Sequence, residues 1–379
     1  MTKILMTGVT GICSPNPILD ELLTSLSGYI GGAVLHRFSQ RPDFNSFDIR
    51  VIVRSAEKGE KIKALYSNVS PAVGSHSDIP FISKEASEVD VVIAMADCDD
   101  VSAVTGTLQG LKKRFQDTGK KPIFINTSGT GVLSDDAAGM YASETIWDDA
   151  DPEQMASLKP SQPHRPVDSK IVAADEEDYV NTYIILPCTI WAIAKGPLFD
   201  QGISNKKSEQ IPALIRASLD RGQAGTVGLG KNIWHNIEIH ELAELYSILF
   251  DAVHSSNKPG QGREGYYFGA NEEHTLYQVG QGISDTLHKL DKGKGEPTTF
   301  TKEEIDRYFN GSSYLGSNSR CRPTRSKALG WAPKLTTNDM IASIYPETEL
   351  IIELGASAKS DINSEGCGFQ AYLLESLRV

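Results

Sequence analysis

The chain has 379 residues, with 49 acidic and 37 basic side chains and a formal net charge of −12. This length suffices for one large α/β domain with a smaller lobe, and the acidic balance excludes the basic face that nucleic acid or an anionic membrane would need. No apolar run reaches the ~18 residues of a membrane span, and the five scattered cysteines form no CxxC pair, so we expect a cytoplasmic protein without disulfides or a metal site.

The first element is an apolar strand over residues 3–7 that runs into Gly8. A second piece that begins at residue 29 completes a glycine-rich strand-to-helix turn. In such turns one glycine makes the bend, one admits the pyrophosphate and one lets the helix pack on the strand. The turn predicts dinucleotide contacts from these residues: Gly8, Thr10, Gly11, Tyr29, Ile30 and Gly31.

Residues 12–28 interrupt this turn, and two interpretations are open. The segment can be a native helix, capped by Asn16, with Pro17 at its first position and a stripe of apolar residues between 18 and 26. It can also be foreign to the fold, such as a translated intron, because its removal restores the motif. We favour the second, since a helix N-terminus must meet the pyrophosphate directly.

Further strands over 50–54, 89–96, 122–128 and 182–187 alternate with helices up to about residue 195. The helix over 101–115 is expected to stop at Gly119. Near-continuous apolar strands separated by helices predict a doubly wound parallel sheet, the Rossmann fold. We place an NAD(P)-binding domain at residues 1–195, a smaller substrate lobe at 196–348, and a loose polar tail at 349–379.

The strand ends bear on the choice of cofactor. Arg54 follows the second strand, where an Asp or Glu would bind the ribose of NAD and an Arg suits the 2′-phosphate of NADP. We therefore favour NADP(H) over NAD(H), although Arg54 can also be an ordinary surface cation. Small or apolar residues at three further strand positions, Ala94, Ala96 and Pro187, are assigned to the same cofactor.

Several pieces together resemble the extended and atypical short-chain dehydrogenase/reductase superfamily, on the side of the epimerases, dehydratases and NmrA-like proteins. The resemblance covers about residues 1–345 and is closest to uncharacterised fungal NAD(P)-binding proteins. The matching segments are the split turn and residues 126–130, 169–175, 184–191, 235–239 and 325–333.

In this superfamily a Ser or Thr holds the substrate oxygen, and a Tyr-x-x-x-Lys pair supplies the general acid/base. The resemblance assigns the first role to Thr127 and Ser128, and places Lys170 on the nicotinamide ribose. The residue four before Lys170 is Pro166 rather than Tyr. His164 has a suitable intrinsic pKa to replace the tyrosine, but it can equally cap a turn.

Other polar residues leave alternatives open. Asp168 and Tyr141 lie in the same interval as His164, and we expect Tyr141 to be a loop aromatic. Cys188 is expected to be a packed small side chain. The late basic cluster either binds an anionic substrate or is a solvated charge run; it consists of Arg320, Arg322, Arg325 and Lys327.

The resemblance implies an NADP(H)-dependent oxidoreductase, epimerase/dehydratase-like, that acts on a small hydroxyl or carbonyl substrate. Thr127 and Ser128 would polarise the substrate oxygen. A homodimer is one assembly that the resemblance allows. The alternative, favoured by the missing tyrosine, is a non-catalytic NmrA-like sensor that binds a dinucleotide.

Overall fold

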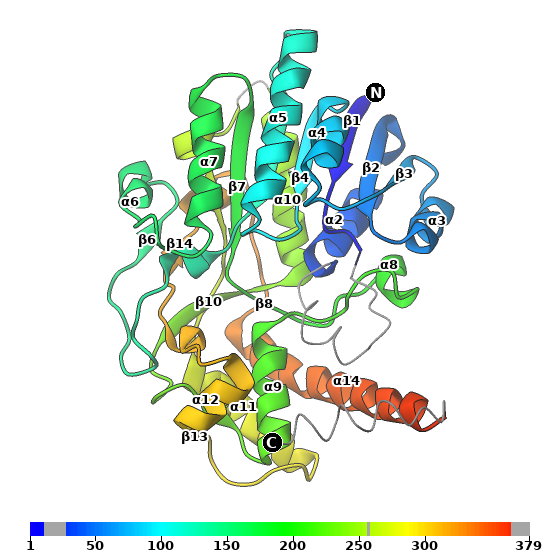
Figure 1. Cartoon of the computed structure of the whole chain (residues 1–379). Coiled ribbons are helices and arrows are strands. Elements are labelled where there is room, and N and C mark those ends of the chain that lie inside the picture. The colour runs from blue at the N-terminus through cyan, green and yellow to red at the C-terminus, as the bar shows by residue number, and fades with distance from the viewer. Residues whose placement is uncertain (11–27, 256–257, 365–379) are drawn as a thin grey trace.

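Seven parallel strands form the large sheet of the computed structural model, which describes residues 1–10, 28–255 and 258–364 (Figure 1). Their order is β11-β7-β5-β4-β1-β2-β3, so the chain winds outward from β1 to β3 and then returns to the other side of β1. This is the doubly wound order that the sequence predicted. The strands are β1 (Thr2–Met6), β2 (Phe47–Val53), β3 (Val69–Val73), β4 (Val91–Ala94), β5 (Ile123–Thr127), β7 (Asn181–Pro187) and β11 (Tyr266–Gly269).

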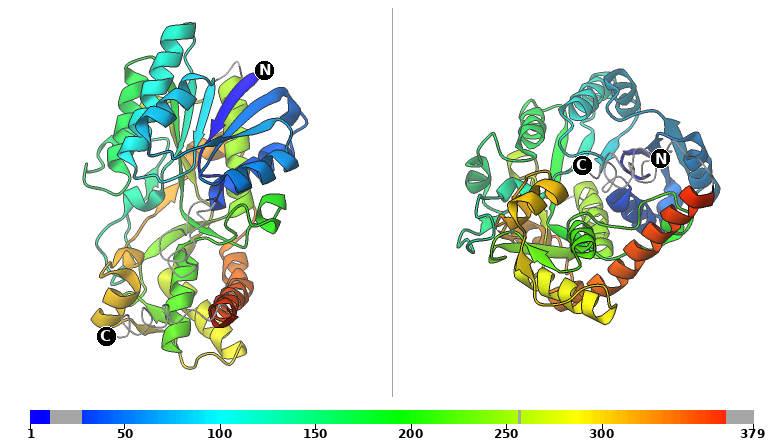
Figure 2. Two further views of the ribbon diagram at one scale, coloured as in Figure 1. Left: turned by 45° about the vertical axis from the view of Figure 1, so that its right-hand side comes forward. Right: turned by 60° about the horizontal axis from the view of Figure 1, so that its bottom comes forward.

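Helices cover both faces of this sheet (Figures 1 and 2). One face carries α4 (Ile79–Ser87), α5 (Val101–Thr118) and α7 (Arg165–Glu176), and the other carries α2 (Tyr29–Ser39) and α10 (Ile239–His254), while α3 (Ala56–Leu65) packs beside β3. Local sequence sets the helix ends. The side chain of Asp100 accepts from the backbone N–H of Ala103 at 2.8 Å to begin α5. Gly119 ends it in the left-handed region, at φ 68°.

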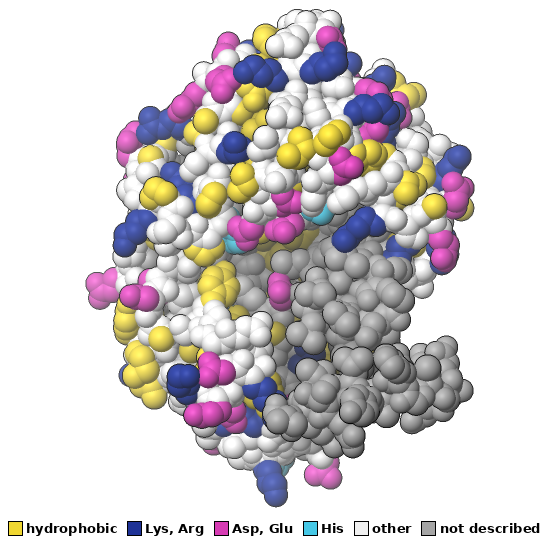
Figure 3. Space-filling model, viewed as in Figure 1, with side chains coloured by type: hydrophobic (Ala, Val, Ile, Leu, Met, Phe, Trp, Pro, Cys, Tyr) yellow, Lys and Arg dark blue, Asp and Glu magenta, His cyan; other side chains and the backbone are white. Residues whose placement is uncertain are grey.

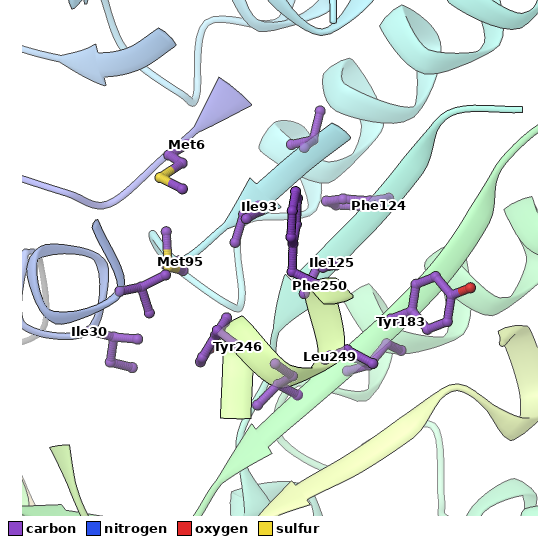
Figure 4. Packing of buried hydrophobic residues seen from close by; sticks show 14 of the residues in the cluster. Met6, Ile30, Ile93, Met95, Phe124, Ile125, Tyr183, Tyr246, Leu249 and Phe250 are labelled. Carbon is purple, nitrogen blue, oxygen red and sulfur yellow. The ribbon is translucent and has the colours of Figure 1, made fainter. Parts of the chain in front are cut away.

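The main core lies between the sheet and these helices. Figure 4 shows how side chains from β4 and β5, such as Ile93 and Ile125, face Tyr246 and Phe250 of α10. All four are at most 3% exposed. Burial of this continuous apolar surface is the main force that holds α10 on the sheet.

A second, smaller core holds the other lobe. Its three-stranded sheet has the order β12-β10-β8, and α9, α11 and α14 pack around it. The elements of this part are β8 (Thr189–Trp191), α8 (Pro197–Asp200), α9 (Gln210–Arg221), β9 (Gly225–Thr226), β10 (Ile233–Glu238), β12 (Glu273–Thr275), α11 (Leu276–Lys289), β13 (Thr298–Thr299), α12 (Lys302–Phe309) and α14 (Thr337–Ser364). Short elements elsewhere are η1 (Phe44–Ser46), η2 (Thr130–Leu133), β6 (Trp147–Asp148), α6 (Pro152–Ala156), η3 (Gly262–Glu264), η4 (Tyr314–Gly316), β14 (Cys321–Arg322) and α13 (Thr324–Ala328).

Two expected boundaries differ from the structure. The large sheet does not end near residue 195, because the chain returns to it with α10 and β11 after entering the second lobe. The segment from residue 349 is not loose at its start, since α14 continues to Ser364, and residues 365–379 lie outside the described part. Among the described residues, no helix combines the length and apolar character needed to cross a membrane.

Candidate functional site

A cleft of about 1030 Å³ crosses the carboxyl ends of the large sheet and opens toward the second lobe. Ends of five strands contribute, through Gly8, Arg54, Ala96, Ser128 and Pro187. Open α/β sheets bind their ligands at this edge, where the strand order reverses. Figure 3 shows acidic and histidine side chains gathered at this hollow, with hydrophobic surface within it.

The two halves of the glycine-rich turn meet in space. Gly8 adopts φ 70°, and a Cβ there would collide with the backbone of Met95. A Cβ on Gly31 would collide with the carbonyl group of Gly8, so α2 packs directly on the turn. Thr10, Tyr29 and Ile30 line the cleft beside it, whereas Gly11 lies outside the described residues.

Helix α2 begins after Gly28, which has φ 94°. The first turn of α2 leaves backbone N–H groups without intrahelical partners at this edge of the cleft, which favours a bound anion. The hydroxyl group of Tyr29 donates to the carbonyl oxygens of Trp191 at 3.0 Å and Ala192 at 2.6 Å. This end of α2 is therefore attached to the second lobe.

Deletion of residues 12–28 tests whether this segment belongs to the site. Gly11 would then precede Tyr29 as Gly28 does now, so the contact of Gly8 with Gly31 is expected to persist. We expect the shortened chain to bind NADP(H) at least about tenfold more tightly, because the deletion brings Gly11 and Gly31 back to the spacing of the dinucleotide-binding motif. Isothermal titration of both chains measures this. Tight binding by the full chain that is lost on deletion would show the segment to be part of the native site.

Arg54 lies at the far end of the cleft, beside His76 and Ser77. Burial lowers the pKa of His76, and the nearby positive charge of Arg54 lowers it further. The carboxylates nearest this end, Asp97 and Asp100, follow β4 rather than β2. Of the other predicted cofactor contacts, Ala96 and Pro187 line the cleft, whereas Ala94 lines a separate small cavity behind it.

Ser128 and Asp168 form a buried pair at the centre of the site. Ser128 follows β5, and its hydroxyl group donates to Oδ2 of Asp168 at 3.0 Å. Asp168 is fully buried in the first turn of α7, and its Oδ1 has no partner among the described residues. Burial raises the pKa of Asp168 to about 7. This carboxyl can therefore accept from Ser128 when ionised and donate to it when protonated.

The raised pKa of Asp168 predicts a pH-dependent loss of stability. Between about pH 4 and pH 7 the unfolded chain has released this proton while the folded chain retains it, so the free energy of unfolding falls as the pH rises. Asp168→Asn removes this contribution. We expect the difference in unfolding free energy between the two chains to change by roughly 2–4 kcal/mol across this window. Urea unfolding at pH 4.5 and 7.5 measures it, and a difference that does not change would contradict the assignment.

His164 begins α7 with its backbone in the left-handed region, at φ 64°. Oδ1 of Asp99 accepts from its backbone N–H at 3.0 Å and lies 2.9 Å from its Nδ1. Burial is the largest single influence and lowers the pKa of His164, but the hydrogen bonds and charges of Asp99 and Cys98 together outweigh it and the pKa rises to about 10. The ring is therefore a cation near neutral pH. Its Nε2 would lie 3.1 Å from a Cβ on Gly129, so that glycine leaves the ring atom accessible.

Cys98 completes this cluster, with its Sγ 3.3 Å from Nδ1 of His164. One donor atom from each of Cys98, Asp99 and His164 lies within 4.8 Å of the others, which is close enough to hold a metal ion. The hydrogen bonds among the three side chains account for the arrangement without an ion. The absence of a metal site stays a prediction.

Two of the predicted catalytic residues have other surroundings than Ser128 and His164. Lys170 is exposed on α7 and is not among the residues that line the cleft. Instead, His164 and Asp168 have the four-residue spacing of the Tyr-x-x-x-Lys pair; His164 lines the cleft, and buried Asp168 contacts Ser128. Thr127 lines the cleft, but its hydroxyl group forms a 2.6 Å hydrogen bond with the hydroxyl of Tyr246.

The second lobe adds residues that sequence reasoning missed. Tyr314 and Trp234 line the cleft and pack edge to face, with ring centroids 5.5 Å apart. A Cβ on Gly131 would collide with the hydroxyl of Tyr314 and lie 2.9 Å from Nε2 of His164. Both polar groups therefore converge above Gly131. No local sequence pattern joins Gly131 to Tyr314, because the contact forms only when the lobes meet.

The late basic cluster does not line the cleft. Arg320 makes two hydrogen bonds to Glu273, at 2.7 and 3.0 Å. Arg322 lies 3.3 Å from Asp148, and Nε of Arg325 donates to a backbone carbonyl at 2.7 Å. These arginines are paired with Glu273 and with residues 148–149 and do not line this cleft, and an anionic substrate bound by them stays a prediction.

Comparison with known proteins agrees with the fold. A scan for known protein families finds none that matches. The chain is 25% identical over 328 residues to oxidase ucsJ of Acremonium sp, which covers 82% of this chain and 91% of that protein.

Solved structures are similar in shape at low sequence identity. UDP-glucose 4-epimerase from Thermotoga maritima is 14% identical with a TM-score of 0.59, and covers 93% of this chain and 100% of its own. UDP-glucuronic acid 4-epimerase from Bacillus cereus, in complex with UDP-glucuronic acid and NAD, is 13% identical with a TM-score of 0.59, and covers 92% and 100%. The dTDP-glucose 4,6-dehydratase DesIV from Streptomyces venezuelae, with NAD bound, is 14% identical with a TM-score of 0.58, and covers 91% and 96%. The predicted resemblance to epimerase/dehydratase proteins is thus confirmed at the level of the fold.

Proposed function

We propose that the protein is an NADP(H)-dependent oxidoreductase of the short-chain dehydrogenase/reductase type, epimerase/dehydratase-like, that acts on a small hydroxyl or carbonyl substrate. One observation carries this proposal: a single cleft connects the glycine-rich turn to Ser128 and His164. A cofactor held at the turn and a substrate held at Ser128 would share that cleft. The similar solved structures that contain NAD support a nicotinamide dinucleotide here.

The residues present fit such a cofactor. Gly8 and Gly31 let β1 and α2 approach closely, which brings the N-terminus of α2 to the edge of the cleft where a pyrophosphate group would bind. Met95 and Ala96 give the cleft an apolar wall beside the turn. When bound, the nicotinamide supplies or accepts the hydride.

The roles of the protein side chains follow from their contacts. The Ser128 hydroxyl, positioned by Asp168, donates to the substrate carbonyl oxygen when Asp168 is protonated and donates to Ser128 in turn. His164, kept protonated by Asp99, donates from Nε2 to that oxygen and stabilises the negative charge that develops during carbonyl reduction. This imidazolium takes the place of the tyrosine and lysine pair that the sequence lacks. Thr127 positions the end of β5 through Tyr246.

The preference for NADP(H) rests on Arg54. Arg54→Asp is expected to weaken NADPH binding by roughly ten- to a hundredfold and to shift preference toward NADH, because a charge-assisted pair with the 2′-phosphate is lost. Isothermal titration with both cofactors measures the shift. Lys63→Asp is the matched control, since Lys63 is exposed on α3 and outside the cleft. An equal effect of both substitutions would show that Arg54 is an ordinary surface cation with no specific contact to the 2′-phosphate.

The direct test of function is hydride transfer between NADPH or NADP⁺ and a broad panel of carbonyl compounds and alcohols. We expect turnover that Ser128→Ala reduces at least a hundredfold while the Kd of NADPH stays unchanged. Carbonyl reduction that persists undiminished in Ser128→Ala would contradict the proposed catalytic centre.

A second candidate function is a non-catalytic NmrA-like sensor. The specific observation in its favour is Pro166, which stands four residues before Lys170 where the superfamily has its tyrosine. Tight NADPH binding without turnover of any compound in the panel would favour the sensor.

A further inference from the structure

The part of the cleft beyond the catalytic centre is apolar and aromatic. We call it the substrate chamber and define it by Cys188, Ile190, Ala213, Trp234, Tyr314 and Leu315. These residues come from the end of β7, from β8, α9, β10 and η4, so the chamber belongs mainly to the second lobe. The indole N–H of Trp234 is already used, because it donates to the carbonyl oxygen of Ser317 at 2.6 Å. The chamber therefore presents the apolar part of this side chain to a ligand.

Three polar groups meet at the catalytic end of the chamber, whereas Ser208, Glu209 and Gln210 line the cleft at the start of α9. Tyr314 brings its hydroxyl to the place above Gly131 that Nε2 of His164 also approaches. This hydroxyl forms no hydrogen bond with another described residue. Ser128, which follows β5, also lines the cleft at this end. The arrangement suits a ligand with one oxygen function at its reacting end and an apolar body.

The charges at the chamber are unsuited to a phosphorylated substrate. Among the described residues that line the whole cleft, Arg54 is the only Arg or Lys, and it lies at the opposite end, after β2. The acidic Glu209 lies at the start of α9, and its charge contributes to the raised pKa of Tyr314 after the larger effect of burial. The segment 11–27 contains no Lys or Arg in its sequence.

A sugar nucleotide would bring a diphosphate into this chamber. Placing those charges near Glu209 is unfavourable, because buried charges require a partner and the one cation at this end, the His164 ring, is already paired with Asp99. Two arginines of the late basic cluster already have acidic partners: Arg320 pairs with Glu273, and Arg322 pairs with Asp148. Aromatic faces, in contrast, stack well on rings.

We propose that the substrate is an uncharged, mainly apolar ring compound with one alcohol or carbonyl group, and that the chamber rejects sugar nucleotides. This deepens the proposed function, on which it rests. The proposed substrate also differs from those of the sugar-nucleotide enzymes that share this fold.

Direct binding tests the proposal without requiring turnover. The full chain, saturated with NADPH, is titrated with 2-tetralone, UDP-glucose, dTDP-glucose, and a matched pair consisting of 4-oxocyclohexanecarboxylate and its methyl ester. We expect 2-tetralone to bind more tightly than either sugar nucleotide, and the methyl ester about tenfold more tightly than the carboxylate. Because binding is measured, this result stands even if no compound in the activity panel is reduced.

Two variants make the test specific to the chamber. Trp234→Ala is expected to weaken 2-tetralone binding about tenfold with an unchanged Kd for NADPH. Glu209→Lys, at an exposed position, is expected to abolish the preference for the ester without affecting the fold. A sugar nucleotide that binds as tightly as 2-tetralone, or a carboxylate that binds the wild-type chain as well as its ester, would overturn the proposal while leaving the oxidoreductase function intact.

Discussion

His164→Asn is expected to lower kcat for carbonyl reduction by about 10²- to 10⁴-fold, the usual contribution of a positioned general acid. Asparagine is the appropriate replacement because it tolerates the left-handed backbone that His164 adopts at φ 64°. Its amide can still donate to Asp99 but carries no positive charge. The effect should therefore appear in kcat rather than in folding or in the Kd of NADPH.

His288→Asn is the matched control, since His288 is exposed on α11 and does not line the cleft. Single-turnover reduction with bound NADPH separates the chemical step from product release. Unchanged thermal unfolding of His164→Asn would show that the fold is intact. If this variant retained more than about a third of wild-type kcat, the charged imidazole would not be the group that assists the reaction.

Gly31→Ala is expected to abolish measurable cofactor binding, because the added methyl group would collide with backbone atoms of Gly8. Backbone cannot move aside as the end of a flexible side chain can, so α2 must shift away from β1. Overpacking of this kind destabilises by typically 1–3 kcal/mol, and here it also displaces the helix N-terminus from the pyrophosphate position.

Gly355→Ala provides the control for this substitution. Gly355 lies on α14, and a Cβ there would meet nothing within 4 Å. Its replacement is expected to leave NADPH binding unchanged and to stabilise the helix slightly. Urea unfolding and titration of both variants measure the two effects. If Gly31→Ala bound NADPH as well as the wild type, the contact of Gly31 with Gly8 would have no part in the site.

The sequence predicted the large sheet well because its signals are local. Apolar runs such as residues 182–187 identify strands buried on both faces, and glycines mark where β1 turns into α2. The return of α10 and β11 to this sheet was missed. The pairing of β11 with β7 depends on contacts between Tyr266 and Ile184, which no local pattern records.

The centre of the site was predicted in part. Ser128 and His164 line the cleft as expected, but the third catalytic position was assigned to Lys170 by alignment. The sequence named Asp168 only as an alternative beside His164 and Tyr141, because its hydrogen bond with Ser128 joins residues 40 positions apart. In the structure Asp168 is buried and hydrogen-bonded to Ser128, while Lys170 is exposed, and the role of Lys170 stays a prediction.

The late arrival of β11 affects how the nascent chain can fold on the ribosome. Strand β7 is complete at Pro187, but its partner β11 begins only at Tyr266. By then the ribosome has also synthesised β8, α9, β9, β10 and α10. Until then the outer edge of β7 has unpaired backbone groups and an apolar face that α10 does not yet cover. Such an edge pairs readily with other chains, so translation through residues 188–265 is the stage at which this protein is most prone to aggregate and most dependent on chaperones.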